Sequence, residues 1–288
     1  MMVWRHFYWL LWLGTLGGCT HLATFQSSGS FEFLPAIPSR NSNAPTGSQL
    51  VRSLAPMSLE MRERTVLREL RRGNVPDFLR HGVPVTYDAL DSLGKKHRVS
   101  VGVLPDYLAI GSNGDFLRIP MTPITAQKIA DQYGMLLPTK RLVDEIYRQA
   151  PMKLPPRPMP AGSSMVSMDF YMRHNQTIRD QLGSAEGGAK IVAGHKKDIV
   201  LTNRLLEARN RVAIYGWHRS ATDPIQPLSI VHGFTYADYS HGIRLVHPMA
   251  LVDAQPWPLI EILEDPVLSR LVSDEGRLRL TRAVGDCR

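Results

Sequence analysis

Histidines are concentrated in the second half of this 288-residue chain. Histidine transfers protons near neutral pH and also binds metal ions. The pairing of histidine with glycine, in either order, occurs four times, and a small neighbour leaves room for a substrate beside the imidazole. The pattern predicts a chemical site in this half of the chain. Six of the 10 histidines lie within 74 residues: His174, His195, His218, His232, His241 and His247.

A metal-dependent hydrolase is the first hypothesis for this site. A catalytic zinc ion needs about three protein ligands and lowers the pKa of its bound water to about 7. No HExxH pattern is present, so the supply of ligand residues, rather than their spacing, suggests a divalent metal such as zinc. The candidate ligands are His195, Asp198, His232 and His241.

A serine hydrolase is the second hypothesis, with Ser240 as the nucleophile. Ser240 is not inside a GxSxG elbow. Neighbours on a strand point to opposite faces, so His241 is badly placed as its base. Another histidine would supply the base, and Asp198 or Asp238 would orient it. The full set of candidate catalytic residues is His195, Asp198, His218, His232, Asp238, Ser240 and His241.

A binding protein without catalysis is the third hypothesis. The histidines would then be hydrogen-bonding residues of a polar, strand-rich core or cleft. Aromatic residues are interleaved with them and could form a platform for sugar rings, which stack on aromatic faces. The protein would bind a glycan or peptidoglycan. These aromatic residues are Tyr215, Trp217, Tyr236 and Tyr239.

One segment resembles the active-site region of L,D-transpeptidases. His232-Gly233 precedes Ser240-His241-Gly242-Ile243-Arg244-Leu245, whereas in that family a histidine-glycine pair precedes a serine-histidine-glycine-cysteine-arginine run. Ile243 stands where the catalytic cysteine would be. Without a thiolate the acyl-enzyme chemistry of the family is lost. The resemblance covers fewer than 20 residues and implies convergence or an inactive relative.

The first 18 residues have the order of a secretory signal peptide. Arg5 precedes the apolar run Phe7–Leu16, which is too short for a bilayer span of about 20 residues. Leu16-Gly17-Gly18-Cys19 resembles the lipobox of bacterial lipoproteins, which implies acylation of Cys19 and a lipid bilayer as partner. An ordinary cleaved signal or a short uncleaved anchor is the alternative. Thr20, rather than aspartate, resembles lipoproteins of the outer membrane that face the periplasm.

The composition favours anionic partners. The formal net charge is +8, from 34 Lys and Arg against 26 Asp and Glu. Such a surplus favours envelope polymers or lipid headgroups, and we expect no nucleic acid because no recognised binding motif appears. Together with the export signal, this predicts a cell-envelope protein, a hydrolase of an envelope polymer or a binding protein for one. Acylation of Cys19 would leave Cys287 without a partner for an intramolecular disulfide.

The body is predicted to be α+β, with helices and hairpins first and strands later. Residues 19–57 are rich in Ser, Pro, Gly and Asn and are predicted to form a flexible tether. Residues 58–150 form a helix and hairpin region, and 165–288 a strand-rich region with terminal helices. The connection, residues 151–164, has five prolines and is either a domain boundary or a strap across the surface.

Capping residues locate four helices and turn residues locate the strands. The helices are expected from Ser58 to Gly73, Thr122 to Gly134, Thr139 to Ala150 and Ser167 to Leu182. The turn at Ser112-Asn113-Gly114-Asp115 predicts a hairpin that continues to Ile119. Later strands are expected at 190–193, 198–202, 211–215, 228–232 and 242–246, and helices at 257–263 and 267–272.

Overall fold

The expected α+β class is confirmed by a computed structural model, which describes residues 36–283. It contains 33% helix and 25% strand, with six α-helices and four sheets in the described range. None of the helices in this range has the length and apolarity needed to cross a bilayer. The predicted signal peptide, Cys19 and the first part of the predicted tether lie outside the described residues.

Four helices begin at the predicted capping residues. In each, the hydroxyl of a Ser or Thr accepts a hydrogen bond from the backbone N–H three residues later, which satisfies one of the free N–H groups of the first turn. The helices are α2 (Leu59–Arg71), α3 (Pro123–Gln132), α4 (Lys140–Gln149) and α5 (Met168–Leu182).

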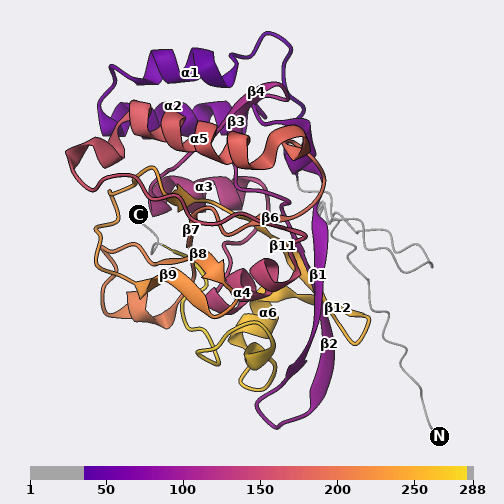
Figure 1. The fold of residues 1–288 in the computed structure, drawn as a ribbon. Coiled ribbons are helices and arrows are strands. Elements are labelled where there is room, and N and C mark those ends of the chain that lie inside the picture. The colour runs from indigo at the N-terminus through magenta and orange to yellow at the C-terminus, as the bar shows by residue number, and fades with distance from the viewer. Residues whose placement is uncertain (1–35, 284–288) are drawn as a thin grey trace, which may run out of the picture. The chain divides into compact units, whose positions relative to one another are not determined.

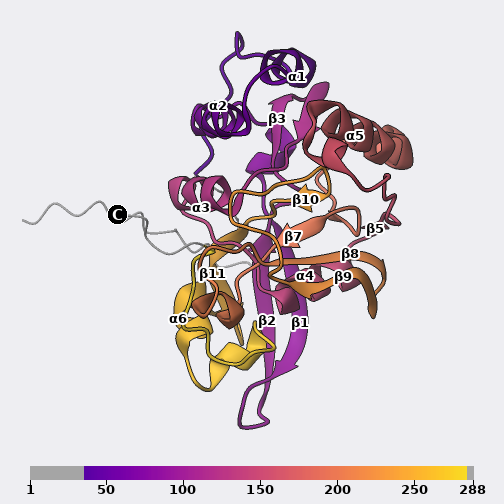
Figure 2. The ribbon, with the colours of Figure 1, turned by 90° about the vertical axis from the view of Figure 1, so that its left-hand side faces the viewer.

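The flexible tether predicted over residues 19–57 is wrong for its last part, which forms the helix α1 (Gly47–Leu54). Thr46 and Gln49 form a capping box at its start. Leu50, Val51 and Leu54 are buried in the main hydrophobic core. The surrounding Pro, Ser and Asn residues hide this short apolar stripe in the sequence. Figures 1 and 2 show α1 at one end of the body, together with α2 and α5.

The largest sheet joins the two regions on either side of the proline-rich connection. Its strand order is β1-β2-β11-β12, all antiparallel. Because β2 precedes the connection and β11 follows it, the two regions share one sheet and one hydrophobic core. The strands are β1 (Val83–Leu90), β2 (Lys96–Val103), β11 (Val246–Val252) and β12 (Gln255–Pro258), followed by α6 (Leu259–Glu264) and a 3₁₀ helix, η5 (Leu268–Leu271).

A second sheet has the order β10-β7-β8-β9 (Figure 2), and three of the seven predicted catalytic residues lie on its strands: Asp198, His218 and His241. β10 pairs parallel with β7, and the other pairs are antiparallel. β9 begins earlier in the chain than the strand expected at 228–232. The first part of β9 was not predicted because it contains prolines, which are tolerated in an edge strand. The strands are β7 (Lys197–Ile199), β8 (Ile214–Ser220), β9 (Asp223–Ser229) and β10 (His241–Gly242).

The proline-rich connection lies as a strap against the body. Its strand β5 (Met152–Lys153) pairs parallel with β6 (Val192–Ala193). Further along, the backbone N–H of Met159 donates to the hydroxyl of Tyr239 at 2.8 Å. The strap therefore covers residues next to the second sheet. The predicted hairpin is present as β3 (Ala109–Ser112) and β4 (Asp115–Arg118).

Candidate functional site

The predicted site residues form two adjoining groups in the fold. The parallel pairing of β10 with β7 sets His241 opposite Lys197 and Gly242 opposite Asp198, so the groups are neighbours. The first group, with Tyr107 and α4, is His195, Asp198 and His218. The second group, around Tyr236, is His232, Asp238, Ser240 and His241.

Asp198 and His218 of the first group line a small cavity between α4, β7 and β8. Its volume is about 10 Å³, room for about one water molecule. Gly194 permits the close packing of this wall, since a Cβ there would lie 2.6 Å from the carbonyl oxygen of Leu154 and the residue has φ +95°. The polar side chains that line the cavity are Tyr107, Tyr147, Asp198, His218 and Arg244.

Asp198 presents a buried carboxyl group to this cavity. The Tyr107 hydroxyl donates to its Oδ2 at 2.8 Å, whereas its Oδ1 has no hydrogen-bond partner among residues 36–283. Burial raises the pKa of Asp198 to about 6. The Arg244 guanidinium lies 4.5 Å from the centre of the Tyr107 ring and donates to the carbonyls of Leu104 and Val192. Asp198 therefore keeps its proton to a higher pH than an ordinary aspartate and is half protonated at about pH 6.

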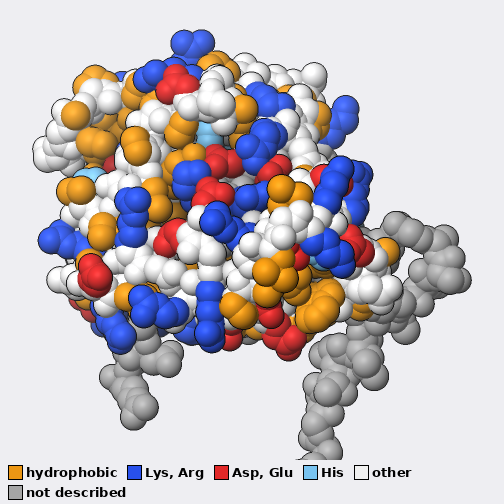
Figure 3. Space-filling model, turned by 90° about the horizontal axis from the view of Figure 1, so that it is seen from below, with side chains coloured by type: hydrophobic (Ala, Val, Ile, Leu, Met, Phe, Trp, Pro, Cys, Tyr) orange, Lys and Arg blue, Asp and Glu red, His pale blue; other side chains and the backbone are white. Residues whose placement is uncertain are grey.

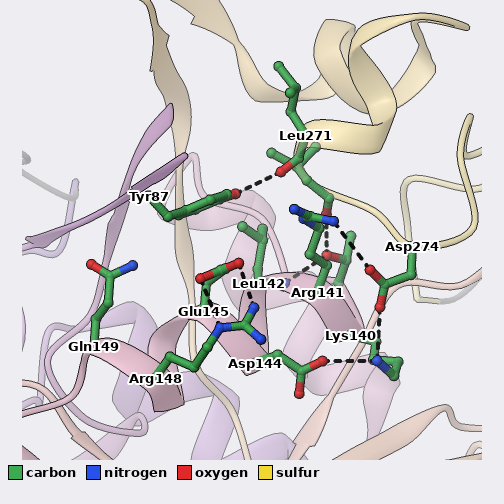
Figure 4. A network of polar contacts seen from close by, with 12 residues as sticks. Tyr87, Lys140, Arg141, Leu142, Asp144, Glu145, Arg148, Gln149, Leu271 and Asp274 are labelled. Carbon is green, nitrogen blue, oxygen red and sulfur yellow. Dashed lines mark hydrogen bonds and ion pairs between the residues drawn. The ribbon is translucent and has the colours of Figure 1, made fainter. Parts of the chain in front are cut away.

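His218 is fixed at the cavity by a carboxylate on α4. Its Nε2 lies 3.0 Å from Oδ1 of Asp144, and its ring stacks on Tyr147 with the centroids 4.6 Å apart. Asp144 also accepts hydrogen bonds from Tyr215 at 2.7 Å and Lys140 at 2.9 Å. Although burial opposes ionisation, the hydrogen bonds from His218, Lys140 and Tyr215 lower the pKa of Asp144. Figure 4 shows Lys140 between Asp144 and Asp274.

The backbone before His218 is strained. Trp217 has φ 57°, a left-handed conformation that is costly for a bulky residue. Its backbone N–H donates to the carbonyl of Lys196 at 3.0 Å, which holds it there. Strained residues persist where the surroundings fix them and are often found at functional sites. This strain lies directly between Gly216 and His218.

A buried ion pair supports the cavity from behind. Asp106 lies between His195, at 3.0 Å from Nε2, and Arg118, whose Nε donates at 2.9 Å. Burial raises the pKa of Asp106, but the charge of Arg118 outweighs it and holds the pKa well below the usual range. Burial lowers the pKa of His195 to about 4, so the imidazole is neutral at neutral pH. His195 therefore packs beside Tyr107 as a supporting residue.

A buried lysine adjoins both groups. The Lys196 ammonium donates to the carbonyl of Tyr239 at 2.7 Å and lies 3.5 Å from Nδ1 of His174. Burial lowers its pKa to about 7. The sequence contained a signal for Lys196, which stands in the string Gly194-His195-Lys196-Lys197-Asp198. The sequence contained no local signal for the partners that lie farther away in the chain, which are Asp106, Tyr107, Arg118, Asp144 and Arg244.

The second group does not contain a serine–histidine pair. The Ser240 hydroxyl donates to Oδ1 of Asp238 at 2.5 Å, and Tyr236 donates to Oδ2 at 3.1 Å. His241 is buried, with Nε2 4.0 Å from Oδ2 of Asp238, and burial lowers its pKa to about 4. Because Ser240 faces a carboxylate and is fully buried, the prediction of Ser240 as a nucleophile with a histidine base is wrong.

The predicted metal ligands do not converge either. His195 faces Asp106 and Asp198 faces Tyr107, while His232 and His241 belong to the second group. Within residues 36–283, no three His, Cys, Asp or Glu side chains are arranged to hold a metal ion. The predicted set His195, Asp198, His232 and His241 is therefore wrong as a single metal centre.

The predicted sugar platform is also wrong for three of its four aromatic residues. Tyr215, Trp217 and Tyr239 are buried, and Tyr236 alone of the four is partly exposed. Ile243, at the position of the missing cysteine, is fully buried as well. No family model, curated protein or solved structure matches this chain.

Proposed function

We propose that this chain is a lipid-anchored cell-envelope hydrolase, in which His218 activates water and Asp198 acts as the acid. One observation carries the proposal: a water-sized cavity is lined both by an imidazole fixed on a carboxylate and by a carboxyl group whose pKa is raised to about 6. Titratable groups with shifted pKa values around one cavity are typical of acid–base sites.

The proposed reaction is a direct attack of water on the scissile bond. Asp144 holds Nε2 of His218, so Nδ1 is the nitrogen that takes a proton from the attacking water. Gly216 leaves room on that side, since a Cβ there would lie 3.5 Å from Nδ1. Asp198 gives its proton to the leaving group and becomes a carboxylate. Proton transfer from His218 to Asp198 then restores both residues.

The substrate class in this proposal is a polymer of the cell envelope. Support comes from the predicted lipobox at Cys19, which implies an outer-membrane anchor facing the periplasm, and from the net charge of +8. Lys and Arg side chains are spread over the face seen in Figure 3 with acidic side chains among them. This distribution favours a long or repeated ligand over a single small anion.

A binding protein without catalysis is the second candidate. It needs no scissile bond at Asp198, where the cavity of about 10 Å³ admits water but no part of a polymer. In the hydrolase, the strap beside Gly194 must therefore move to admit the scissile bond.

Release of soluble fragments from dye-labelled peptidoglycan by the full chain tests the hydrolase. His218→Gln and Asp198→Asn should each lower the rate by about 10²- to 10⁴-fold, as expected for loss of a general base or acid. His81→Gln is the control, because this histidine is exposed and outside the site, and it should leave the rate unchanged. No release by the wild type, or equal release by His218→Gln, would make the binding protein the better proposal.

A further inference from the structure

A second, larger hollow lies away from the cavity at Asp198, between α1, α5 and β4. Its volume is about 300 Å³, which is within the range of small-ligand sites. Phe116 and Leu117 of β4 contribute to its lining, with Val51 of α1 on one side and Met172 of α5 on another. We call it the α1–α5 cleft.

The α1–α5 cleft carries charges of both signs. Asp115, Asp169, Arg173 and Arg179 all line it, so it has no net preference for an anion or a cation. Asp115 is engaged by the backbone and hydroxyl of Ser48, and Arg179 by Glu186. The side chains of Asp169 and Arg173 are 70% and 59% exposed, and their charged atoms lie 3.5 Å apart. Because an exposed ion pair contributes little stability, each residue can leave the other and pair with a charged group of a ligand at little cost.

The length of the cleft is set by α5. Asp169 and Arg179 are ten residues apart on this helix and both line the cleft, which corresponds to about 15 Å. An extended peptide covers this length with about four residues. Met172, which is 42% exposed, adds an apolar contact three residues along α5 from Asp169.

Recognition in this cleft must come from side chains rather than from strand pairing. The Asn175 amide occupies the outer edge of β4, donating to the carbonyl of Phe116 at 3.0 Å and accepting from the N–H of Arg118 at 3.1 Å. Sugar stacking is also disfavoured. Of the described residues that line the cleft, Phe116 is the one aromatic residue, and it is 2% exposed.

We propose that the α1–α5 cleft binds a short extended peptide carrying both a carboxylate and an amine. The peptide carboxylate binds Arg173 and its amine binds Asp169, and an apolar side chain rests on Met172. This site is separate from the cavity at Asp198, and the inference does not depend on hydrolysis there.

Calorimetric titration of the full chain in detergent tests the inference with three probes. They are the tetrapeptide Glu-Ala-Lys-Ala, whose two charged side chains share one face when it is extended, the uncharged tetrapeptide Gln-Ala-Gln-Ala, both with blocked termini, and the tetramer of N-acetylglucosamine. The charged peptide should bind, and Arg173→Ala should weaken it at least about tenfold through loss of a charge-assisted contact. Met172→Trp, which fills the cleft, should weaken it as well.

The matched control is Arg64→Ala, because Arg64 forms an exposed pair with Glu60 at the same helical spacing on α2. It should leave peptide binding unchanged. The inference is overturned if the charged peptide does not bind, if the sugar tetramer binds in its place, or if Arg64→Ala weakens the peptide as much as Arg173→Ala.

Discussion

The cavity at Asp198 and the α1–α5 cleft use charged residues in opposite ways. Around the cavity, Asp106, Arg118 and Lys196 are almost completely buried, and burial shifts pKa values. In the cleft, Asp169 and Arg173 remain exposed to solvent. Burying a charge is costly, so a fold retains such groups where they support one another or do chemistry. Exposed charges cost little and suit reversible binding. The two regions therefore differ in how strongly single substitutions should act.

The largest expected effect is the loss of the buried ion pair behind the cavity. Asp106→Ala leaves the Arg118 guanidinium, which is 0% exposed, without its carboxylate at 2.8 Å, and Glu186 at 3.2 Å is then its one remaining carboxylate partner among residues 36–283. We expect the free energy of unfolding to fall by about 3–5 kcal/mol, as for removal of one partner of a buried pair. Urea unfolding of the full chain followed by circular dichroism measures it.

Asp169→Ala is the control in the cleft and should cost less than about 1 kcal/mol, because its pair with Arg173 is exposed. If Asp106→Ala prevents folding, Asp106→Asn gives a smaller loss that can be measured. Equal losses for Asp106 and Asp169 variants would remove the distinction between the two regions.

Asn175 is where the two regions meet. It bonds to β4 in the cleft, and its Oδ1 accepts from the backbone N–H of Arg118, whose side chain holds Asp106. Asn175→Ala leaves a buried carbonyl and a buried N–H without partners, and we expect a loss of about 1–3 kcal/mol in unfolding free energy. Peptide binding in the cleft should weaken as well, because Asn175 lines it.

The neighbouring amide provides the control for this substitution. Gln176 lies on the same helix and also lines the cleft, but it is exposed, and its amide donates to the exposed Asp180 at 2.7 Å. Gln176→Ala should change the unfolding free energy by less than about 0.5 kcal/mol. A similar loss for both variants would show that Asn175 does not connect the cleft with the buried ion pair.

Local signals explain which parts of the fold were predictable. Ser58, Thr122, Thr139 and Ser167 predicted their helices because capping acts over three residues. The helix α1 was missed although Thr46 and Gln49 form a capping box, because the helix is short and much of its stability comes from packing of Leu50, Val51 and Leu54 into the core.

The candidate site was predictable only in part, because many of its contacts join residues that are far apart in the sequence. Asp198 and His218, both singled out from the sequence, line one cavity, and Lys196 stands beside Asp198 in sequence. Asp106, however, is 89 residues from His195, and its contact depends on tertiary packing that no local pattern encodes. His232 and His241 were expected at the same centre but lie around Tyr236, because their strand and loop turn toward the other side of β7.

Counted per pH unit, the smallest expected effect is a dependence of stability on pH that comes from Lys196. Its pKa is lowered by burial from the ordinary value of 10.5 to about 7 in the folded chain. Between these values the unfolded chain holds a proton that the folded chain has lost, so the free energy of unfolding rises with pH, by at most about 1.4 kcal/mol per pH unit. Below about pH 7 both states are protonated and this contribution is constant.

Lys196→Met removes the titrating group while keeping a side chain of similar length. The variant should have its greatest advantage in stability near pH 7, where the wild type keeps a buried ammonium, and this advantage should shrink as the pH rises to about 9.5. Urea unfolding at intervals between pH 7 and 9.5 measures the two curves.

Lys197 also has a lowered pKa, but it is present in both proteins and its contribution cancels in the difference. Lys190→Met, at an exposed position, should give a curve parallel to the wild type. If the Lys196→Met curve is parallel too, Lys196 titrates at its ordinary pKa, and the contrast between a buried region that titrates and an exposed cleft that does not is lost.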